Sequence, residues 1–289
     1  MNTQREPQFE IIWPKAEELQ FLGGKGSGLC KMLVAGLPVP PFFALSISPV
    51  ANQDNFEISR SVFQDLAMAA HRLSAPPWAV RSSAWGEDGS SASFAGLFQS
   101  VLGVKTDAEL FDAIRQCSAS LRLARVKQYC EAKGIPLPSR ITVIVQQFIT
   151  PRAAGIAFGK HPVLQNQNGI LLEGSWGAGT TVVSGLVTPD RWFVSSDATR
   201  VERFELGNKT IMDVWRENGL VRIHVKEDKR EQACLSEAEV LHLARLVRKT
   251  EATVGYSPDI EWVCDDQQIY LVQCRPVTRA PLQGMRASR

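Results

Sequence analysis

The sequence has few of the residues that form disulfide frameworks or metal clusters. Its six cysteines are scattered without a C-x-x-C pair, and it contains only four histidines. Isolated cysteines of this kind are typical of buried thiols in a reducing compartment rather than of disulfides or metal ligands. We therefore expect a cytoplasmic protein with free thiols.

A long apolar run and a surplus of one charge are also missing. No stretch reaches the roughly 20 apolar residues that cross a bilayer, and the polar, acidic N-terminus does not resemble a signal peptide. The 32 basic and 30 acidic side chains are interspersed, with a formal net charge of +2. We expect neither a membrane nor a nucleic-acid partner, although a local basic cleft for phosphates remains open.

What is present is a chain of strands and helices. The 289 residues, 44% of them hydrophobic, suffice for one large domain or for two lobes around a shared cleft. The clearest element is a helix over 237–254, where Ser236 and Glu239 form a capping-box signature and Gly255 is a natural stop. Further predicted elements are helices over 24–37 and 107–133 and strands over 78–80, 141–145, 153–158, 169–172, 260–264 and 268–274. This alternation predicts α/β or α+β layers.

A glycine-rich segment, FLGGKGSGL at 21–29, opens the first predicted helix. Glycines let the backbone approach an anion closely, and Lys25 adds a point charge to the positive end of the helix. The segment is not a Walker A loop, because Leu19 stands where that loop needs glycine and Gly26 where it needs Ser or Thr. A plain helix N-terminus explains the pattern at least as well.

A second segment joins Arg81, at the end of a short apolar strand, to a loop of small residues over 89–96. An arginine in this place can grip phosphate oxygens through two hydrogen bonds, and the loop can offer backbone N–H donors to a polyphosphate. A flexible surface turn, in which Glu87 and Asp88 neutralise Arg81, is an equally good interpretation.

The third pattern is a hairpin near the C-terminus. If Glu261 lies opposite Gln273, then Asp259 lies opposite Arg275, and the four side chains share one face. That patch suits Mg²⁺ with a nucleotide, because Mg²⁺ takes oxygen ligands from one or two carboxylates and from substrate phosphates. The register requires a loop of three or five residues, or a bulge, since a two-residue turn would send Gln273 to the other face. An ordinary Asp–Arg salt bridge across an exposed hairpin is the alternative.

Together these segments resemble the ATP-binding domain shared by phosphoenolpyruvate synthase, pyruvate phosphate dikinase and rifampin phosphotransferase. The matching stretches, in order, are GGKGSGL at 23–29, VP within LPVPPFF at 37–43, VRSSAWGEDGSSASFAG at 80–96, VIVQQFITPRAAGIAF at 143–158, VVSGLVTPDRW at 182–192, and DIEWV with LVQCRPVT at 259–278. The resemblance covers almost the whole chain. It implies an α+β fold of the ATP-grasp type, with lobes over 1–149 and 150–280 that enclose a nucleotide cleft, and a tail over 281–289.

The resemblance also implies roles for particular residues. Lys25, Arg81 and Arg275 would be catalytic, and Glu261 and Gln273 would hold Mg²⁺. The residues implied in ATP binding are Lys25, Arg81, Ser93, Gly96, Gln146, Gln147, Ile149, Asp259, Glu261 and Gln273. Of these, Gln146, Gln147 and Ile149 would contact adenine, and the loop 89–96 would cover the phosphates.

The chain departs from the family pattern in three places. Phe158-Gly159 stands where the family has Phe-Thr, and Gly177-Ala178-Gly179-Thr180 stands where it has Gly-Leu-Gly-Glu. The sequence ends soon after the Arg-Pro motif, and none of His71, His161, His224 and His242 lies in the Thr-x-His-Ala setting of the family's phosphohistidine. We therefore expect that this chain alone does not complete a phosphohistidine relay.

These observations predict an ATP- and Mg²⁺-dependent phosphotransferase of the kinase or dikinase type. It would pass phosphate or pyrophosphate directly to a small-molecule acceptor. Two alternatives stay open. In the first, the chain would be the nucleotide-binding subunit of a split phosphoenolpyruvate-synthase-like enzyme with a separate phosphohistidine carrier protein. In the second, it would be a non-catalytic ATP-binding regulatory module.

Overall fold

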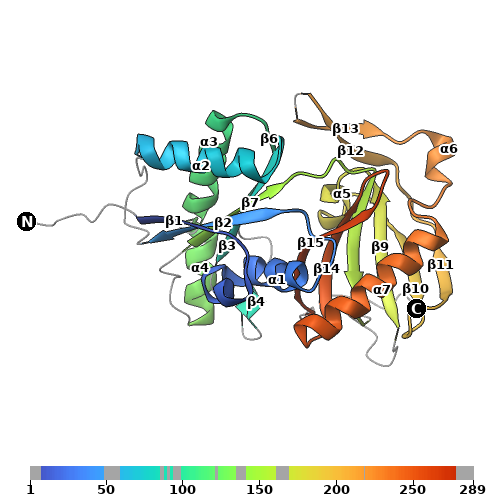
Figure 1. Ribbon diagram of the computed structural model, residues 1–289. Helices are drawn as coiled ribbons and strands as arrows, with labels where there is room; N and C mark the ends of the chain where they lie inside the picture. Colours follow the sequence, from blue (N-terminus) through green and yellow to red (C-terminus); the bar gives the residue numbers. More distant parts are fainter. Residues whose placement is uncertain are drawn as a thin grey trace, which may run out of the picture.

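The computed structural model describes residues 8–48, 59–84, 88–89, 92–93, 99–120, 123–134, 141–160, 169–217 and 219–277. These residues form two antiparallel sheets that lie side by side, with helices packed against them (Figure 1). The α+β class predicted from the sequence is confirmed. Within the described ranges, no helix is both long and apolar enough to cross a membrane.

The first sheet has the strand order β1-β2-β7-β3-β6. Its strands are β1 (Gln8–Ile12), β2 (Phe42–Ser48), β7 (Ile141–Gln147), β3 (Trp78–Ala84) and β6 (Ser100–Val104), and the helices on one face are α2 (Arg60–Leu73), α3 (Asp107–Ala119) and α4 (Ala124–Lys133). Alternate strand residues, such as Val80, Val143 and Leu45, are buried against these helices because successive side chains point to opposite faces. The remaining face, which carries Arg81, is therefore turned away from them.

The second sheet has the order β11-β10-β9-β8-β14-β15. Its strands are β11 (Val201–Glu205), β10 (Asp190–Val194), β9 (Ile170–Trp176), β8 (Ala153–Phe158), β14 (Pro258–Cys264) and β15 (Ile269–Pro276). The long helix α7 (Glu237–Val254) packs on it through an apolar stripe that includes Leu243 and Val247. Both predicted ends of α7 are confirmed, since Ser236 forms the capping box with Glu239 and Gly255 ends the helix at a φ of 79°.

Helix α1 (Gly23–Val34), which follows a short 3-10 helix, η1 (Ala16–Phe21), lies between the sheets. Its Leu29 and Met32 are fully buried in a core that takes in α7, the second sheet and Ile144 of β7. The linker between β7 and β8 contains the lobe boundary proposed at 149/150. A lobe of residues 1–149 nevertheless shares this core with residues 150–280, so the division stays a prediction.

The expectation of one helix over 107–133 was wrong. The chain leaves α3 after Ala119 and begins α4 at Ala124. At the end of α3, the hydroxyls of Ser118 and Ser120 donate hydrogen bonds to the carbonyls of Ile114 and Cys117. Serine hydroxyls that bond to nearby backbone carbonyls compete with continued helix, which apolar periodicity alone does not reveal.

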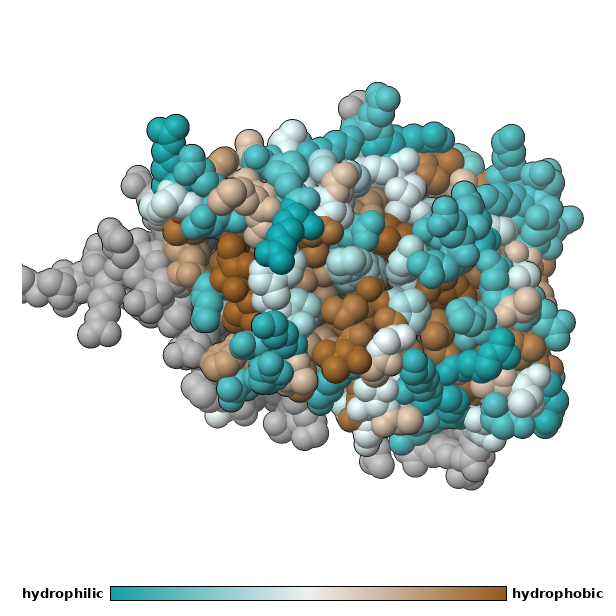
Figure 2. Space-filling view, viewed as in Figure 1, coloured by the Kyte–Doolittle hydropathy of each residue, from teal (hydrophilic) through white to brown (hydrophobic). Residues whose placement is uncertain are grey.

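Smaller elements stand outside the two sheets. They are α5 (Thr180–Val183), α6 (Glu227–Arg230), the hairpin of β12 (Ile211–Arg216) with β13 (Gly219–His224), and the short pair β4 (Asp88–Gly89) with β5 (Ala92–Ser93). In Figure 1 the β12–β13 hairpin extends along the top of the molecule toward β6. The same upper edge is largely hydrophilic in the space-filling view of Figure 2.

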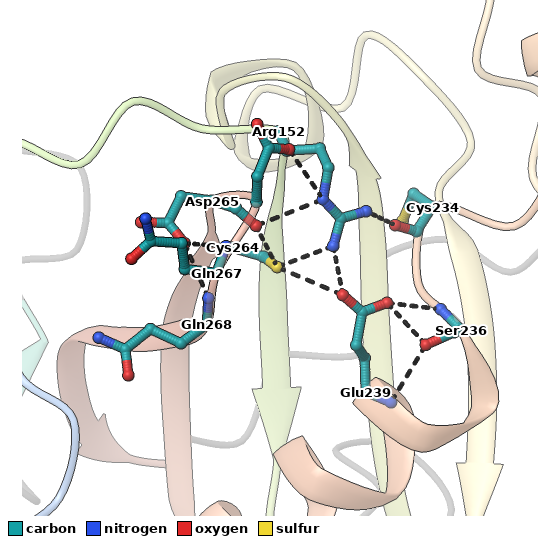
Figure 3. Close-up of polar contacts among 9 residues, drawn as sticks. Arg152, Cys234, Ser236, Glu239, Cys264, Asp265, Gln267 and Gln268 are labelled. Carbon is teal, nitrogen blue, oxygen red and sulfur yellow. Dashed lines mark hydrogen bonds and ion pairs between the residues drawn. The ribbon is translucent and has the colours of Figure 1, made fainter.

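The linker between the sheets is fixed at its end by Arg152 (Figure 3). The guanidinium donates to Glu239 at the start of α7, to the Cys234 carbonyl at 3.1 Å and to the Asp265 carbonyl at 3.3 Å. It also lies 2.9 Å from Cys264 Sγ, where burial raises the thiol pKa to about 11. All six cysteines are buried and free, as the sequence predicted.

Helix α1 approaches β15 so closely that glycine is required at the contact. A Cβ on Gly28 would lie 2.6 Å from the backbone oxygen of Cys274. We predict that Gly28→Ala lowers the free energy of unfolding by about 1–3 kcal/mol, because overpacking outweighs the better helix propensity of alanine. Urea denaturation measures this. The control is Gly179→Ala, whose Cβ would meet Ala154 Cβ at an ordinary 3.5 Å. Equal stability of the two variants would contradict the steric explanation.

Candidate functional site

Arg81 connects the two sheets at the candidate site. Its side chain leaves β3 of the first sheet and is 11% exposed. Nη2 donates to Glu261 Oε2 at 2.8 Å and to Gln273 Oε1 at 2.7 Å, and Nη1 donates to the carbonyl of Val272. One guanidinium from the first sheet therefore binds three acceptors on the β14–β15 hairpin of the second.

The register of that hairpin is the one predicted from the sequence. Glu261 lies opposite Gln273 and Asp259 opposite Arg275. The register then shifts by one position, because Trp262 pairs with Leu271 and Val272 is the extra residue of a bulge. The predicted bulge, not a three- or five-residue loop, thus sets the register. It also directs the Val272 carbonyl to Arg81.

Asp259 and Arg275 form an ion pair across the same hairpin. Arg275 Nε donates to Asp259 Oδ2 at 2.8 Å, and Nη2 of the same arginine lies 2.7 Å from that oxygen. Burial raises the pKa of the Asp259 carboxyl, while the neighbouring Arg275 opposes that shift. The pair is the salt bridge of the alternative interpretation, but the hairpin is not exposed there, because Asp259 and the adjoining Gln273 are buried.

Lys25 lies close to Arg81 because the start of α1 is bound to β3. Lys25 is 9% exposed, and its Nζ lies 3.4 Å from the carbonyl of Ser82. The Ser83 hydroxyl donates to the Leu22 carbonyl at 2.9 Å and accepts from the Gly26 amide at 3.2 Å. These bonds place the lysine against the backbone of β3, at the residue that follows Arg81.

The glycines of the 23–28 segment have packing reasons as well as a possible anion-binding reason. Gly23 has a φ of 67°, and a Cβ there would lie 2.5 Å from Ser83 Oγ. Gly28 meets the backbone of β15. The glycine pattern by itself therefore does not separate a phosphate loop from a tightly packed helix start, and the placement of Lys25 carries more weight.

The residues expected near adenine divide between two environments. Gln146 and Gln147 are consecutive on β7, so their side chains point to opposite faces. The Gln146 amide is buried and donates to the Pro40 carbonyl at 3.2 Å. Ile149 instead packs with Ala154 and Val263, and partly buried Tyr270 and Val272 join them. We call Ile149, Ala154, Val263, Tyr270 and Val272 the apolar cluster; it adjoins the Arg81 site because Val272 belongs to both.

Two expected site residues lie in the short segment before β6. Ser93 ends β5 and pairs with Asp88 of β4. Gly96 lies outside the described residues. The cover that the loop 89–96 was expected to form therefore stays a prediction.

The positions that depart from the family pattern have specific neighbours. A Cβ on Gly159 would lie 2.6 Å from Pro258 Cδ and 2.8 Å from Ser257 Oγ, so larger residues do not fit without a shift. The Thr180 hydroxyl donates to Asp213 Oδ2 at 2.7 Å. Sequence reasoning missed Asp213 because its contact with Thr180 joins a separate hairpin to α5, and no local motif marks such a contact.

The family model of the pyruvate phosphate dikinase AMP/ATP-binding domain matches residues 51–287. The chain belongs to this family. Membership in the dikinase AMP/ATP-binding family, together with the two-sheet α+β architecture, agrees with the ATP-grasp fold inferred from the motifs. The family match reaches Arg81 and the whole β14–β15 hairpin, and thus most of the expected site.

Three similar proteins span nearly all of this chain. The uncharacterized phosphotransferase YvkC of Bacillus subtilis is 34% identical over 93% of the chain and 35% of its own length. A probable phosphoenolpyruvate synthase of Methanothermobacter thermautotrophicus is 30% identical over 91% of this chain and 44% of its own length. The prodigiosin synthesizing transferase PigC of Serratia marcescens is 30% identical over 93% of this chain and 33% of its own length. The chain thus spans less than half the length of each of these relatives.

Removal of the Arg81 side chain should weaken the connection between the sheets. Arg81→Ala deletes bonds to Glu261, Gln273 and Val272, and we expect a loss of about 1–3 kcal/mol in the free energy of unfolding. Chemical denaturation measures it. The exposed pair of Arg115 with Asp112 provides the control, since Arg115→Ala should change stability by less than about 0.5 kcal/mol. Similar values for the two variants would show that Arg81 does not join the sheets in solution.

Proposed function

We propose that this chain binds ATP with Mg²⁺ between its two sheets and transfers phosphate or pyrophosphate to a small-molecule acceptor. The observation that carries the proposal is the meeting of Arg81 from one sheet with Glu261 and Gln273 from the other. Beside this polar patch, the apolar cluster offers a surface on which a nucleobase can lie. A polar phosphate site next to an apolar base site is the arrangement that a nucleotide needs.

The chemistry of the donor set fits Mg²⁺. Glu261 Oε2 and Gln273 Oε1 both bind the same cationic nitrogen, at 2.8 and 2.7 Å, so the two oxygens already converge on one positive charge. One carboxylate and one amide are a poor cage for bare Mg²⁺, but they suit Mg²⁺ that brings nucleotide phosphates as further ligands. In the described part of the chain, no group of three or more His, Cys, Asp or Glu side chains is arranged to hold a metal. Bound there, Mg²⁺ would neutralise phosphate charge.

If Mg²⁺ binds at Glu261 and Gln273, Arg81 has two alternative sets of partners, these side-chain oxygens and the nucleotide phosphates. Glu261 and Gln273 cannot offer the same oxygens at full strength to a guanidinium and to a divalent cation, because the two positive charges repel at this distance. We infer that Arg81 moves from these oxygens to the nucleotide phosphates when the metal binds. Lys25 and Arg275 would add positive charge beside it, and phosphoryl transfer depends mainly on such positioning and charge neutralisation.

A second candidate is a nucleotide-binding part of a larger assembly. The similarity to a probable phosphoenolpyruvate synthase supports this candidate. In that case a phosphohistidine carrier on another chain would receive the phosphate. We propose a cytoplasmic location, which the six buried free thiols support.

The nucleotide product distinguishes these functions. Incubation of ATP with candidate acceptors should yield ADP if one phosphate moves, or AMP if the transfer is of the dikinase type. Chromatography of the nucleotides measures both. Tight ATP binding without turnover, with any acceptor or carrier tried, would contradict the enzymatic proposal and support a binding module.

Loss of either phosphate-binding cation should weaken ATP binding. We expect Lys25→Ala and Arg81→Gln each to reduce the affinity for a non-hydrolysable ATP analogue with Mg²⁺ by about tenfold, or roughly 1.4 kcal/mol. Calorimetry gives the affinities. Wild-type affinity in both variants would remove the phosphate-binding assignment.

The same two variants should differ in metal binding without nucleotide. Arg81→Gln frees Glu261 and Gln273 from their guanidinium partner, so we expect the affinity for Mn²⁺ alone to rise by about tenfold. Lys25→Ala leaves these oxygens occupied and should leave it unchanged. Paramagnetic resonance of free Mn²⁺ measures both. An unchanged or lower Mn²⁺ affinity in Arg81→Gln would show that the oxygens do not form a metal site.

A further inference from the structure

The β12–β13 hairpin is anchored to the second sheet through Asp213. The Asp213 carbonyl accepts from the Ala178 amide at 2.8 Å, and its carboxylate accepts from the Thr180 hydroxyl at 2.7 Å. Across the hairpin, Arg222 donates to both carboxylate oxygens, at 2.9 and 3.0 Å, and these bonds lower the Asp213 pKa. The base of the hairpin is therefore bound to the turn that follows β9.

Trp215, two residues after Asp213 on β12, contacts the first sheet. Residues two apart on a strand share a face, so Trp215 and Asp213 point to the same side of the hairpin. A Cβ on Gly103 of β6 would lie only 1.6 Å from Trp215 Cη2, and Gly103 has a φ of 73°. The indole thus occupies space that only a glycine leaves open on the edge strand of the first sheet.

Trp215 also contacts the linker between the sheets. Its ring lies 4.9 Å from the ring of Phe148, centroid to centroid, and Lys105 Nζ lies 5.3 Å from the indole centroid. Phe148 precedes Ile149 of the apolar cluster. One side chain of the hairpin therefore touches the edge of the first sheet and the linker, while its strand is anchored to the second sheet.

We propose that the β12–β13 hairpin is a clasp between the two sheets and that Trp215 is a positioning residue for the nucleotide site. Docked on Gly103 and Phe148, Trp215 holds the sheets at the spacing at which Arg81 reaches Glu261 and Gln273. The effect on ATP rests on the proposed function, but the clasp itself does not. When Trp215 cannot dock, the population with adjacent sheets falls, and apparent nucleotide affinity falls in the same proportion.

The tests use steric and chemical variants with a matched control. Trp215→Ala removes the docking ring, and Gly103→Ala fills the space that the ring occupies. Gly103→Ala also carries the strain of an L residue at positive φ. Gly134→Ala is its control, because Gly134 has a φ of 63° and a Cβ added there would have no neighbouring atom within 4 Å. Trp215→Phe keeps an aromatic ring of smaller size.

The first readout needs no nucleotide. Hydrogen exchange of backbone amides in β6 and in the linker 148–152 should accelerate by about tenfold in Trp215→Ala and Gly103→Ala. It should stay at the wild-type rate in Gly134→Ala, and Trp215→Phe should restore most of the protection. Unfolding midpoints establish that the variants remain folded. Wild-type exchange in both clasp variants, or equal acceleration in Gly134→Ala, would overturn the proposal.

The second readout is the affinity for the ATP analogue with Mg²⁺. We expect about a tenfold loss in Trp215→Ala and Gly103→Ala, little change in Gly134→Ala, and a smaller loss in Trp215→Phe. Faster exchange in the clasp variants with unchanged ATP affinity would overturn the positioning role. A wild-type protein that binds no ATP would refute the proposed function, while the exchange rates would still decide whether the clasp exists.

Discussion

The guanidinium of Arg81 and its acceptors on β14–β15 tie together parts of the chain that the sequence keeps far apart. Three bonds join β3 to Glu261, Gln273 and the Val272 carbonyl. A single planar cation satisfies a carboxylate, an amide and a backbone group at once, which is the strength of arginine over lysine in such a place. Lys25, the bulge at Val272 and the apolar cluster all lie next to this junction.

The junction depends on supports that lie outside it. Arg152 fixes the end of the linker to α7 and to the β14–β15 loop, and α1 is bound to β3 through Ser83. Trp215 meets Gly103 of β6 and Phe148 of the linker. Charged and polar groups at the site are thus held by packed backbone rather than by one another alone, which is the condition for a preorganised binding site.

Elements with a strong local signal were predictable from the sequence. The capping box of α7 and the pairing of Glu261 with Gln273 follow from side-chain chemistry and strand alternation, and both are present. The break between α3 and α4 was not predicted, because helix periodicity continues through the serines that end α3. Apolar periodicity predicts that a segment is helical, but it does not show where a serine hydroxyl ends the helix.

The contacts between segments were beyond the sequence. Nothing in the string of residues reveals that Thr180 meets Asp213, or that the Val272 carbonyl turns to Arg81. The glycines at 23–28 illustrate the same limit, because one pattern is compatible with close packing and with anion binding, and the structure shows the close packing. The order of the motifs identified the family, whereas the tertiary structure shows which of the expected side chains lie together at the candidate site.

The contact of α1 with β15 has a consequence for how the chain is made. Gly28, near the beginning of the sequence, lies against Cys274, near its end, and the Leu271 amide bonds to the Pro38 carbonyl at 2.8 Å. Closing so long a loop is slow, because its entropy is lost before the contact stabilises anything. During synthesis, the apolar face of α1 must wait until β15 has left the ribosome. The helix that carries Lys25 is therefore translated long before β15, one of its native neighbours.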